Sequence, residues 1–185
     1  REERLFLAAG LAGYGDPPGE GTVFGVPADG IGAAVPESWR IARTERGKPY
    51  FPDRRDLHFS ISHSRDLWAC AFSGRPVGLD VQAHVKKRGE GDGEAAARLG
   101  RMAGRFFHPE EAAWVREDPF ERFFRIWAAK ESYVKYTGEG IGAGFGRFCV
   151  MPGRRQEMPG LQGPAAWEAE GASFFGRRIL NGEAG

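Results

Sequence analysis

Cysteine is scarce, and long apolar runs are missing. The chain has 185 residues but only two cysteines, Cys70 and Cys149, and each lies in a short apolar stretch typical of a strand. This usage excludes the disulfide framework of a small secreted protein, so we expect buried free thiols and a cytoplasmic protein. No apolar run approaches the roughly 20 residues of a membrane helix, and we recognise no signal peptide. Because the sequence begins with Arg1, we expect the natural N-terminus to be missing.

Net charge is also small. The chain carries 26 Lys and Arg against 25 Asp and Glu, which gives a net charge of +1. This balance argues against a general nucleic-acid or membrane binder. The short basic runs Arg154-Arg155 and Arg177-Arg178 lack the interleaved aromatic residues of a nucleic-acid site. At this length the chain can bury about 70% of its unfolded surface, in one large domain or two small ones.

Hydrophobic periodicity and turn residues predict a chain that mixes helices and strands. Helical patterns cover Arg1–Ala12, Ala95–Phe107, a segment that starts at Pro109, and Phe120 to Gly138. Strand patterns cover Thr22–Val26, Trp39–Arg43, Leu57–Ser62, Asp66–Phe72, Pro76–Gln82, Arg147–Met151, Ala166–Glu170 and Ser173–Ile179. The charged, Gly-rich run His84–Arg98 is predicted to be a mobile loop. Three neighbouring strands, the third being Pro76–Gln82, suggest an antiparallel meander.

The helix from Phe120 has well-defined ends and one unusual residue. Asp118 is a suitable N-cap, Pro119 fits the first helical position, and Gly138 ends the helix. Glu131 falls in the middle of the apolar stripe of this helix, and Lys135 follows one turn later. A carboxylate there must be satisfied by a partner. Either Glu131 pairs with Lys135, or a metal ion or anionic substrate is held by Glu131 between the flanking lysines.

Two other segments carry polar groups whose interpretation stays open. Asp80 and Gln82 lie two residues apart on one face of a predicted strand, where they either meet solvent or coordinate a hard cation together. Lys48 lies between Gly47 and Pro49 on a predicted tight turn, where it is either a surface lysine or part of a binding site.

Four segments taken in order resemble one known family. They are Gly47-Lys48-Pro49, Ser62-His63-Ser64, Gly78-Leu79-Asp80-Val81-Gln82, and the run from Trp127 to Lys135, which reads WAAKESYVK. In this order and spacing they resemble the 4′-phosphopantetheinyl transferases of the surfactin-synthetase-activating type. The motif WxxKESxxK is the most specific of the four. The resemblance runs from about Arg4 to Val150, and the N-terminal stretch and the final strands of the family look cut or divergent.

The resemblance implies an α+β monomer built from two similar α/β halves with pseudo-twofold symmetry, each an antiparallel sheet packed with helices. The halves would be residues 1–75 and 76–185, with the active-site cleft between them. Coenzyme A would be the substrate. The reaction would move its 4′-phosphopantetheine group onto a serine of an apo acyl, peptidyl or aryl carrier protein and release adenosine 3′,5′-bisphosphate. We expect neither nucleic acid nor a membrane as a partner.

The resemblance also implies roles for single residues. Asp80 and Glu131 would hold Mg²⁺, with Mn²⁺ as an alternative, and Gln82 would be a third ligand. Glu131 would also act as general base, and Lys135 would bind the pyrophosphate and protonate the leaving group. The remaining coenzyme A contacts would come from Arg4, Lys48, Ser62, His63 and Lys130.

One departure from the family keeps a second interpretation open. Many members have Glu where this chain has Gln82, so a catalytically impaired homologue that binds coenzyme A or a carrier protein is the alternative. An amide oxygen can still coordinate Mg²⁺ or hold a metal-bound water. Carrier proteins of the family are mostly acidic, and Lys86, Lys87, Arg88 and the helix from Arg101 are candidates to meet one. Charge runs of this kind are also common on solvated loops.

Overall fold

The computed structural model describes residues 22–27, 40–65, 67–140, 142, 144–151 and 165–176. Its contacts divide the chain into two units: Arg1–Ala83 with Glu131–Ala143, and His84–Lys130 with Gly144–Gly185. The division falls inside helix α4 (Pro119–Thr137), between Lys130 and Glu131. The helix expected over Arg1–Ala12, and with it Arg4, lies outside the described residues. The two contiguous halves expected from the sequence stay a prediction.

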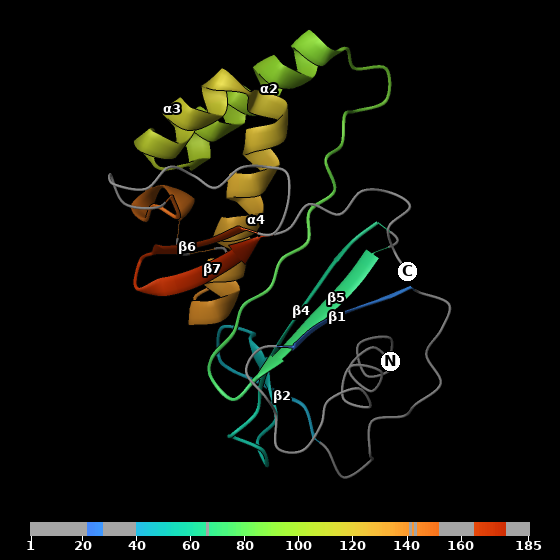
Figure 1. The fold of residues 1–185 in the computed structure, drawn as a ribbon, viewed down its shortest axis with the longest axis vertical. Coiled ribbons are helices and arrows are strands. Elements are labelled where there is room, and N and C mark those ends of the chain that lie inside the picture. Colours follow the sequence, from blue (N-terminus) through green and yellow to red (C-terminus); the bar gives the residue numbers. More distant parts are fainter. Residues whose placement is uncertain are drawn as a thin grey trace. The chain divides into compact units, whose positions relative to one another are not determined.

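The first unit contains two small antiparallel sheets (Figure 1). Its strands are β1 (Thr22–Pro27), β2 (Ala42–Arg43), β3 (Pro49–Tyr50), β4 (His58–Ser64) and β5 (Leu67–Ser73). The larger sheet has the order β1-β5-β4, and β2 pairs with β3. The strands predicted at β1, β2, β4 and β5 are confirmed to within three residues, whereas β3 was not predicted.

One face of β4 builds the core of the first unit. Phe59 is 2% exposed, and its ring packs between those of Phe51 and Phe72 at centroid distances of 4.6 and 6.2 Å. Leu57 and Cys70 complete the buried cluster. Burial of these apolar side chains stabilises the sheet at about 25 cal/mol for each Å² removed from water. The opposite face of β4 is covered as well, since Ser60 and Ser62 are also buried.

The predicted third strand of the meander, Pro76–Gln82, is wrong: this segment makes no strand. The chain instead runs alongside β4 in the parallel sense, and its main-chain N–H groups donate to serine side chains of β4. The bonds join Leu79 N to Ser60 Oγ (2.9 Å), Val81 N to Ser62 Oγ (3.1 Å) and Ala83 N to Ser64 Oγ (3.0 Å). We call these three residues of β4 the serine ladder. Because hydroxyl groups replace main-chain carbonyls as acceptors, no β-ladder forms.

The second unit combines helices with a β-hairpin. Its elements are α2 (Asp92–Phe106), α3 (Pro109–Glu117), the first part of α4, the 3₁₀ turn η2 (Phe145–Arg147), β6 (Ala165–Ala169) and β7 (Ala172–Gly176). Helix α2 packs on α3, and β6 pairs with β7 in antiparallel fashion. Both helices and both strands were predicted from the sequence, to within three residues at every boundary that the structure describes.

Two expectations for the second unit are wrong. The predicted strand Arg147–Met151 begins in the η2 turn and makes no sheet. The predicted mobile loop His84–Arg98 is helical from Asp92 onward. Arg98 also binds Glu90 through two hydrogen bonds of 2.7 and 2.9 Å, so the segment before α2 is anchored to it.

Helix α4 follows its sequence signals closely. Glu121 N donates to Asp118 Oδ1 at 3.5 Å at the start, and Gly138 follows the last residue with φ +75°. In the second unit, the ring of Phe123 stacks between those of Phe107 and Trp127 at 5.1 and 5.7 Å. No helix in the described part of the chain is long and apolar enough to cross a membrane. Helices together with small antiparallel sheets make this an α+β protein, as predicted.

Candidate active site

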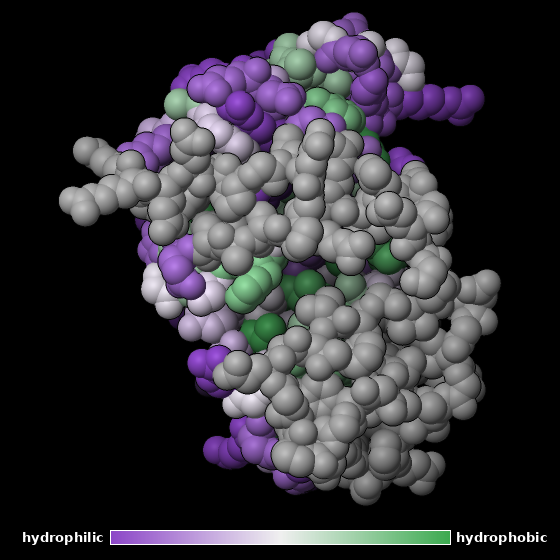
Figure 2. All heavy atoms as spheres, viewed as in Figure 1, coloured by the Kyte–Doolittle hydropathy of each residue, from purple (hydrophilic) through white to green (hydrophobic). Residues whose placement is uncertain are grey.

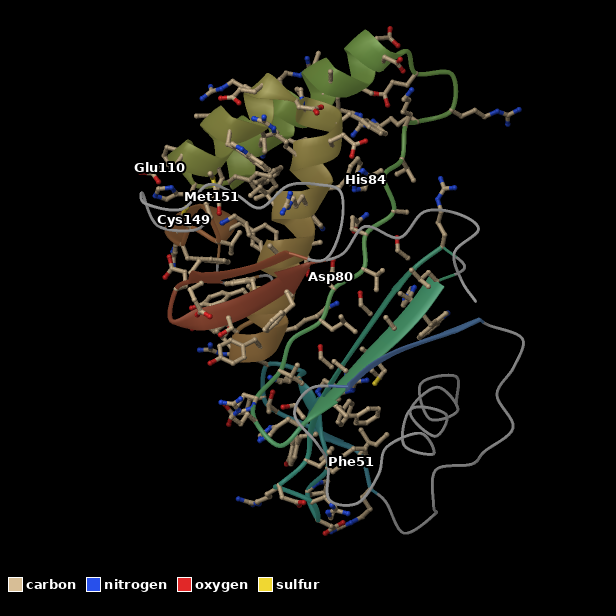
Figure 3. All side chains as sticks on the ribbon, viewed as in Figure 1. Phe51, Asp80, His84, Glu110, Cys149 and Met151 are labelled. Carbon is tan, nitrogen blue, oxygen red and sulfur yellow. The ribbon has the colours of Figure 1, made fainter. Side chains whose placement is uncertain are left out.

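Asp80 is the centre of the candidate site, and the serine ladder positions it (Figure 3). Its Oδ1 accepts hydrogen bonds from Ser62 Oγ and from Lys135 Nζ, both at 2.8 Å. Its Oδ2 is buried and has no hydrogen-bond partner among the described residues. The side chain is only 7% exposed. A buried carboxylate oxygen without a partner is costly, so this atom is suited to bind a cation or a donor that the described residues do not supply.

Gly78 explains why Asp80 lies so near α4. A Cβ atom at this position would lie 1.9 Å from the Ser132 carbonyl oxygen and 2.5 Å from Tyr136 N. Only glycine permits this approach, because both contacts are to helix backbone that cannot move aside. The Gly-x-Asp spacing therefore places a carboxylate directly against the turn of α4 that carries Lys135.

Glu131 lies one turn before Lys135 on the same helix and is half-buried. Burial raises the pKa of Glu131, the negative charge of Asp80 raises it further, and Lys135 opposes the shift. The two carboxylates are thus close enough to repel each other, and Lys135 offsets part of this repulsion. This arrangement favours a bound cation or proton over two free negative charges.

A pocket of about 310 Å³ opens beside Glu131 and Lys135 in the first unit. Its charged lining consists of Arg43, Arg46, Lys48, Glu131 and Lys135. Four cationic side chains against one carboxylate make the pocket suitable for an anionic ligand such as a phosphate group. Arg43 and Arg46 were not singled out from the sequence, because nothing in the local pattern distinguishes them from other surface arginines.

Lys48 lies on a tight turn, as predicted, and that turn faces the end of α4. Gly47 adopts φ +88°, and the Lys48 Nζ donates to the Tyr136 carbonyl oxygen at 2.6 Å. Burial lowers the pKa of Lys48. A cation at the C-terminus of a helix is favourable, because the last carbonyl groups there lack helical partners. The lysine therefore anchors the turn to α4 and at the same time lines the pocket.

The neighbours Ser62 and His63 project from opposite faces of β4, as successive strand residues must. Ser62 is buried against Asp80, whereas His63 is exposed and stacks on Trp68 at a ring distance of 4.5 Å. The Gln82 Nε2 donates to the Ala83 carbonyl oxygen at 3.4 Å, a bond that does not use its amide oxygen. Ser62 thus joins the Asp80 cluster, while the roles expected for His63 and Gln82 stay predictions.

Lys130 has partners that the sequence did not suggest. It is 0% exposed, and its Nζ lies 2.7 Å from Glu111 Oε2 and 2.6 Å from the carbonyl oxygens of Phe145 and Phe148. Burial lowers the pKa of Lys130 and raises that of Glu111, and each charge opposes the shift of the other. All three donor positions of the ammonium are thus engaged within the second unit. We therefore leave Lys130 out of the ligand contacts proposed below.

The residues of the first unit fit a Mg²⁺ ion with two carboxylate ligands. Among the described residues the buried Oδ2 of Asp80 has no hydrogen-bond partner, and the charge of Asp80 raises the pKa of Glu131. Hard divalent cations prefer such oxygen ligands and keep several waters. The amide oxygen of Gln82 would have to replace a third carboxylate.

Comparisons with known proteins show the family of the chain. Residues 76–175, more than half of the chain, match the family model of the 4′-phosphopantetheinyl transferase superfamily. A 4′-phosphopantetheinyl transferase of Bacillus subtilis is 34% identical over 110 residues, which cover 57% of this chain and 44% of the relative. The transferase Sfp of Bacillus subtilis is 32% identical over 115 residues (60% and 46%), and HetI of Nostoc sp. is 39% identical over 104 residues (52% and 40%).

The chain belongs to the 4′-phosphopantetheinyl transferase superfamily. The resemblance to its surfactin-synthetase-activating type is confirmed. The chain spans about half the length of the curated relatives that it matches.

Proposed function

We propose that this protein transfers the 4′-phosphopantetheine group of coenzyme A to a serine of an apo carrier protein. The observation that carries the proposal is the buried Oδ2 of Asp80, which has no hydrogen-bond partner in the described part of the chain and belongs to a cluster with Glu131 and Lys135. Membership of the family and the three relatives described above, each a 4′-phosphopantetheinyl transferase, support this choice of reaction. The products would be holo carrier protein and adenosine 3′,5′-bisphosphate.

Asp80 and Glu131 would hold Mg²⁺, or Mn²⁺ in its place, with Gln82 as a further oxygen ligand. The ion would neutralise the charge of the pyrophosphate during transfer. Lys135 would bind the pyrophosphate, and Arg43, Arg46 and Lys48 give the adjoining pocket the positive charge that the phosphates of coenzyme A require. His63, exposed near the end of β4, and Arg4 are further proposed contacts to coenzyme A.

Glu131 would accept the proton of the attacking serine hydroxyl. The serine oxygen then bonds to the phosphorus that carries the pantetheine arm, and the bond from this phosphorus to the bisphosphate oxygen breaks. The raised pKa of Glu131 supports a role in proton transfer. Lys135 could return a proton to the leaving bisphosphate. Positioning and charge neutralisation, rather than a covalent intermediate, would supply most of the catalysis.

A surface of α2 supports the choice of an acidic carrier protein as partner. Arg101 and Arg105 are exposed there, and Arg105 lies 5.2 Å from the ring of Phe106, which is 42% exposed. Figure 2 shows a mainly hydrophilic surface over this helix. Cationic groups around one apolar contact suit an acidic protein surface with an apolar centre. Acyl, peptidyl and aryl carriers all remain candidates.

The finer features of the family stay part of this proposal. The proposed protein has two similar halves, residues 1–75 and 76–185, which are related by pseudo-twofold symmetry around an active-site cleft. It is a cytoplasmic monomer that binds neither nucleic acid nor a membrane. The alternative function is a homologue that binds coenzyme A or a carrier without catalysis. Gln82, which takes the place of a carboxylate found in many members, favours that alternative.

Replacement of Glu131 separates the two functions. We expect Glu131→Gln to abolish phosphopantetheine transfer and leave binding of coenzyme A within a few-fold, because the amide cannot accept the serine proton and is a poorer metal ligand. Glu139→Gln, an exposed glutamate beyond the end of α4, is the matched control and should keep full activity. Transfer by Glu131→Gln at the wild-type rate would refute the assigned role, and coenzyme A binding without transfer by the wild type would favour the alternative.

A further inference from the structure

A second group of potential metal ligands lies in the second unit, outside the residues assigned above. One ligand atom each from His108, Glu110 and Cys149 lies within 4.8 Å of the other two. His108 and Glu110 come from the start of α3, and Cys149 comes from the segment after η2 (Figure 3). Among the described residues this is the one cluster of three or more such side chains with metal-ligand spacing.

The fold fixes both sides of this cluster through one buried carboxylate. Glu111 is 0% exposed; its Oε2 accepts from His108 N at 2.9 Å and its Oε1 from Val150 N at 2.7 Å. The main chain on either side of the cluster is thus tied to the same side chain. The ion pair of Glu111 with Lys130, whose Nζ donates to the Phe148 carbonyl oxygen, adds a third attachment. These attachments hold the potential ligands in place before a metal ion binds.

The backbone of Cys149 has a further restraint. Its N–H donates to Glu170 Oε1 at 2.9 Å, which links it to the turn between β6 and β7. On the other side of the cluster, His108 Nδ1 accepts a hydrogen bond from Glu110 N at 3.4 Å. This cap bond is long, so a metal at that nitrogen would displace only a weak interaction.

We propose that His108, Glu110 and Cys149 bind one divalent transition-metal ion of the zinc class. Imidazole, carboxylate and thiolate together suit Zn²⁺ or Co²⁺, whereas Mg²⁺ takes oxygen ligands. Three protein ligands leave a fourth position open, filled by water or an exogenous group. This site offers nitrogen and sulfur ligands, whereas Asp80 and Glu131 offer only oxygen. The proposal therefore does not depend on the transfer reaction proposed above.

The charges around the thiol are compatible with a cation. Burial is the largest cause that raises the pKa of Cys149; the negative charges of Glu111 and Glu110 raise it further, and Lys130 offsets part of their effect. Since Lys130 is engaged with Glu111, the carboxylate of Glu110 remains as an exposed negative group at the cluster. Metal binding would release the thiol proton, as it does at other cysteine sites.

Cobalt titration of the metal-free chain tests the site, because a thiolate bound to Co²⁺ gives an intense charge-transfer band in the near ultraviolet. We expect one equivalent of Co²⁺ to produce this band and the strong visible absorption of tetrahedral cobalt, and one equivalent of Zn²⁺ to remove both. Cys149→Ser should lose the charge-transfer band. Cys70→Ala, which removes the buried free cysteine of the first unit, should keep it.

Two further variants test the other ligands. Glu110→Gln should weaken cobalt binding at least about tenfold, a loss typical of disturbed metal shells. Glu117→Gln, at the far end of α3, should bind cobalt like the wild type. His108→Gln should weaken binding by as much as Glu110→Gln, with folding checked by circular dichroism. The proposal is overturned if the wild type shows no thiolate band, if the band survives in Cys149→Ser, or if cobalt binds with the weak spectrum of oxygen ligands only.

Discussion

The hydroxyl of Ser62 holds Asp80 by a hydrogen bond of 2.8 Å to Oδ1 and also accepts the N–H of Val81 at 3.1 Å. One serine thus fixes both the carboxylate and the main chain that carries it. Ser60, two residues earlier on β4, accepts the N–H of Leu79 at 2.9 Å, and no hydrogen bond from it to Asp80 is found. The two serines therefore form a matched pair, of which only one bonds the proposed metal ligand.

A comparison of Ser62→Ala with Ser60→Ala should show whether Ser62 positions the metal ligand Asp80 in addition to stabilising the fold. Loss of one hydrogen bond to a buried group lowers the free energy of unfolding by roughly 1–3 kcal/mol, so we expect both Ser62→Ala and Ser60→Ala to be less stable. Only Ser62→Ala should raise the Mg²⁺ concentration needed for half-maximal transfer, by about tenfold. The measurement is a Mg²⁺ titration of transfer, and equal Mg²⁺ requirements in the two variants would contradict the role of Ser62.

Gly78→Ala should lower the stability of the first unit far more than a glycine-to-alanine substitution at an open position. The new Cβ would lie 1.9 Å from the Ser132 carbonyl oxygen, so the segment that carries Asp80 must move off α4. We expect loss of transfer and a lower melting temperature. Gly100→Ala is the control: this glycine lies inside α2 with nothing within 4 Å of an added Cβ, and the change should stabilise the helix by about 0.5–1 kcal/mol. Full activity in Gly78→Ala would show that the close approach is not needed.

The contact between Glu90 and Arg98 should make stability depend on pH. The pKa of Glu90 is lowered to about 2, first by hydrogen bonds from Arg98 and then by the main chain of Lys87. A lowered pKa stabilises the folded state fully above the unfolded value near 4.5, and this contribution is lost as pH falls from there to about 2. Glu90→Gln should therefore melt below the wild type at pH 7.

The difference between Glu90→Gln and the wild type should shrink as pH falls from 4.5 toward 2. Glu168→Gln, at an exposed position of β6, should match the wild type across the same range. Thermal unfolding from pH 2 to pH 7 checks both expectations. A deficit in Glu90→Gln that stays constant with pH would mean that the charge of Glu90 contributes nothing.

Substitution on the surface of α2 should weaken binding of the carrier protein and leave binding of coenzyme A unchanged. Arg105→Glu reverses a charge beside the exposed Phe106 ring. We expect the KM for an acidic carrier protein to rise about tenfold, while the KM for coenzyme A stays the same, and we expect the effect to weaken in high salt. Arg116→Glu, on the exposed part of α3, is the matched control. An unchanged KM for the carrier in Arg105→Glu would remove α2 from the proposed docking surface.

Local signals in the sequence were sufficient for most elements of the fold. Both ends of α4 followed from Asp118, Pro119 and Gly138, because caps and helix breakers act within one turn. The third strand of the meander was wrong for a reason that strand periodicity cannot reveal. Alternation identifies an extended segment, but it does not say whether main-chain carbonyls or serine hydroxyls accept its hydrogen bonds.

The candidate site was predictable only in part. Asp80, Glu131 and Lys135 come together as the family motifs suggested, and Gly78 explains the spacing of one motif. The ion pair of Lys130 was not foreseen because its partner Glu111 lies on another helix, 19 positions earlier in the chain, and no local pattern connects them. The pocket arginines and the cluster around Cys149 were missed for the same reason: each depends on contacts between segments distant in sequence.

The most direct test of the central claim is intact mass spectrometry of apo carrier proteins incubated with this protein, coenzyme A and Mg²⁺. We predict that at least one carrier gains the mass of a single phosphopantetheine group, and that a chelator or Glu131→Gln abolishes the gain. A panel of acyl, peptidyl and aryl carriers would rank the partners in the same experiment. If no carrier gains mass although coenzyme A binds, or if the gain persists in chelator, the proposed metal-dependent transfer is contradicted.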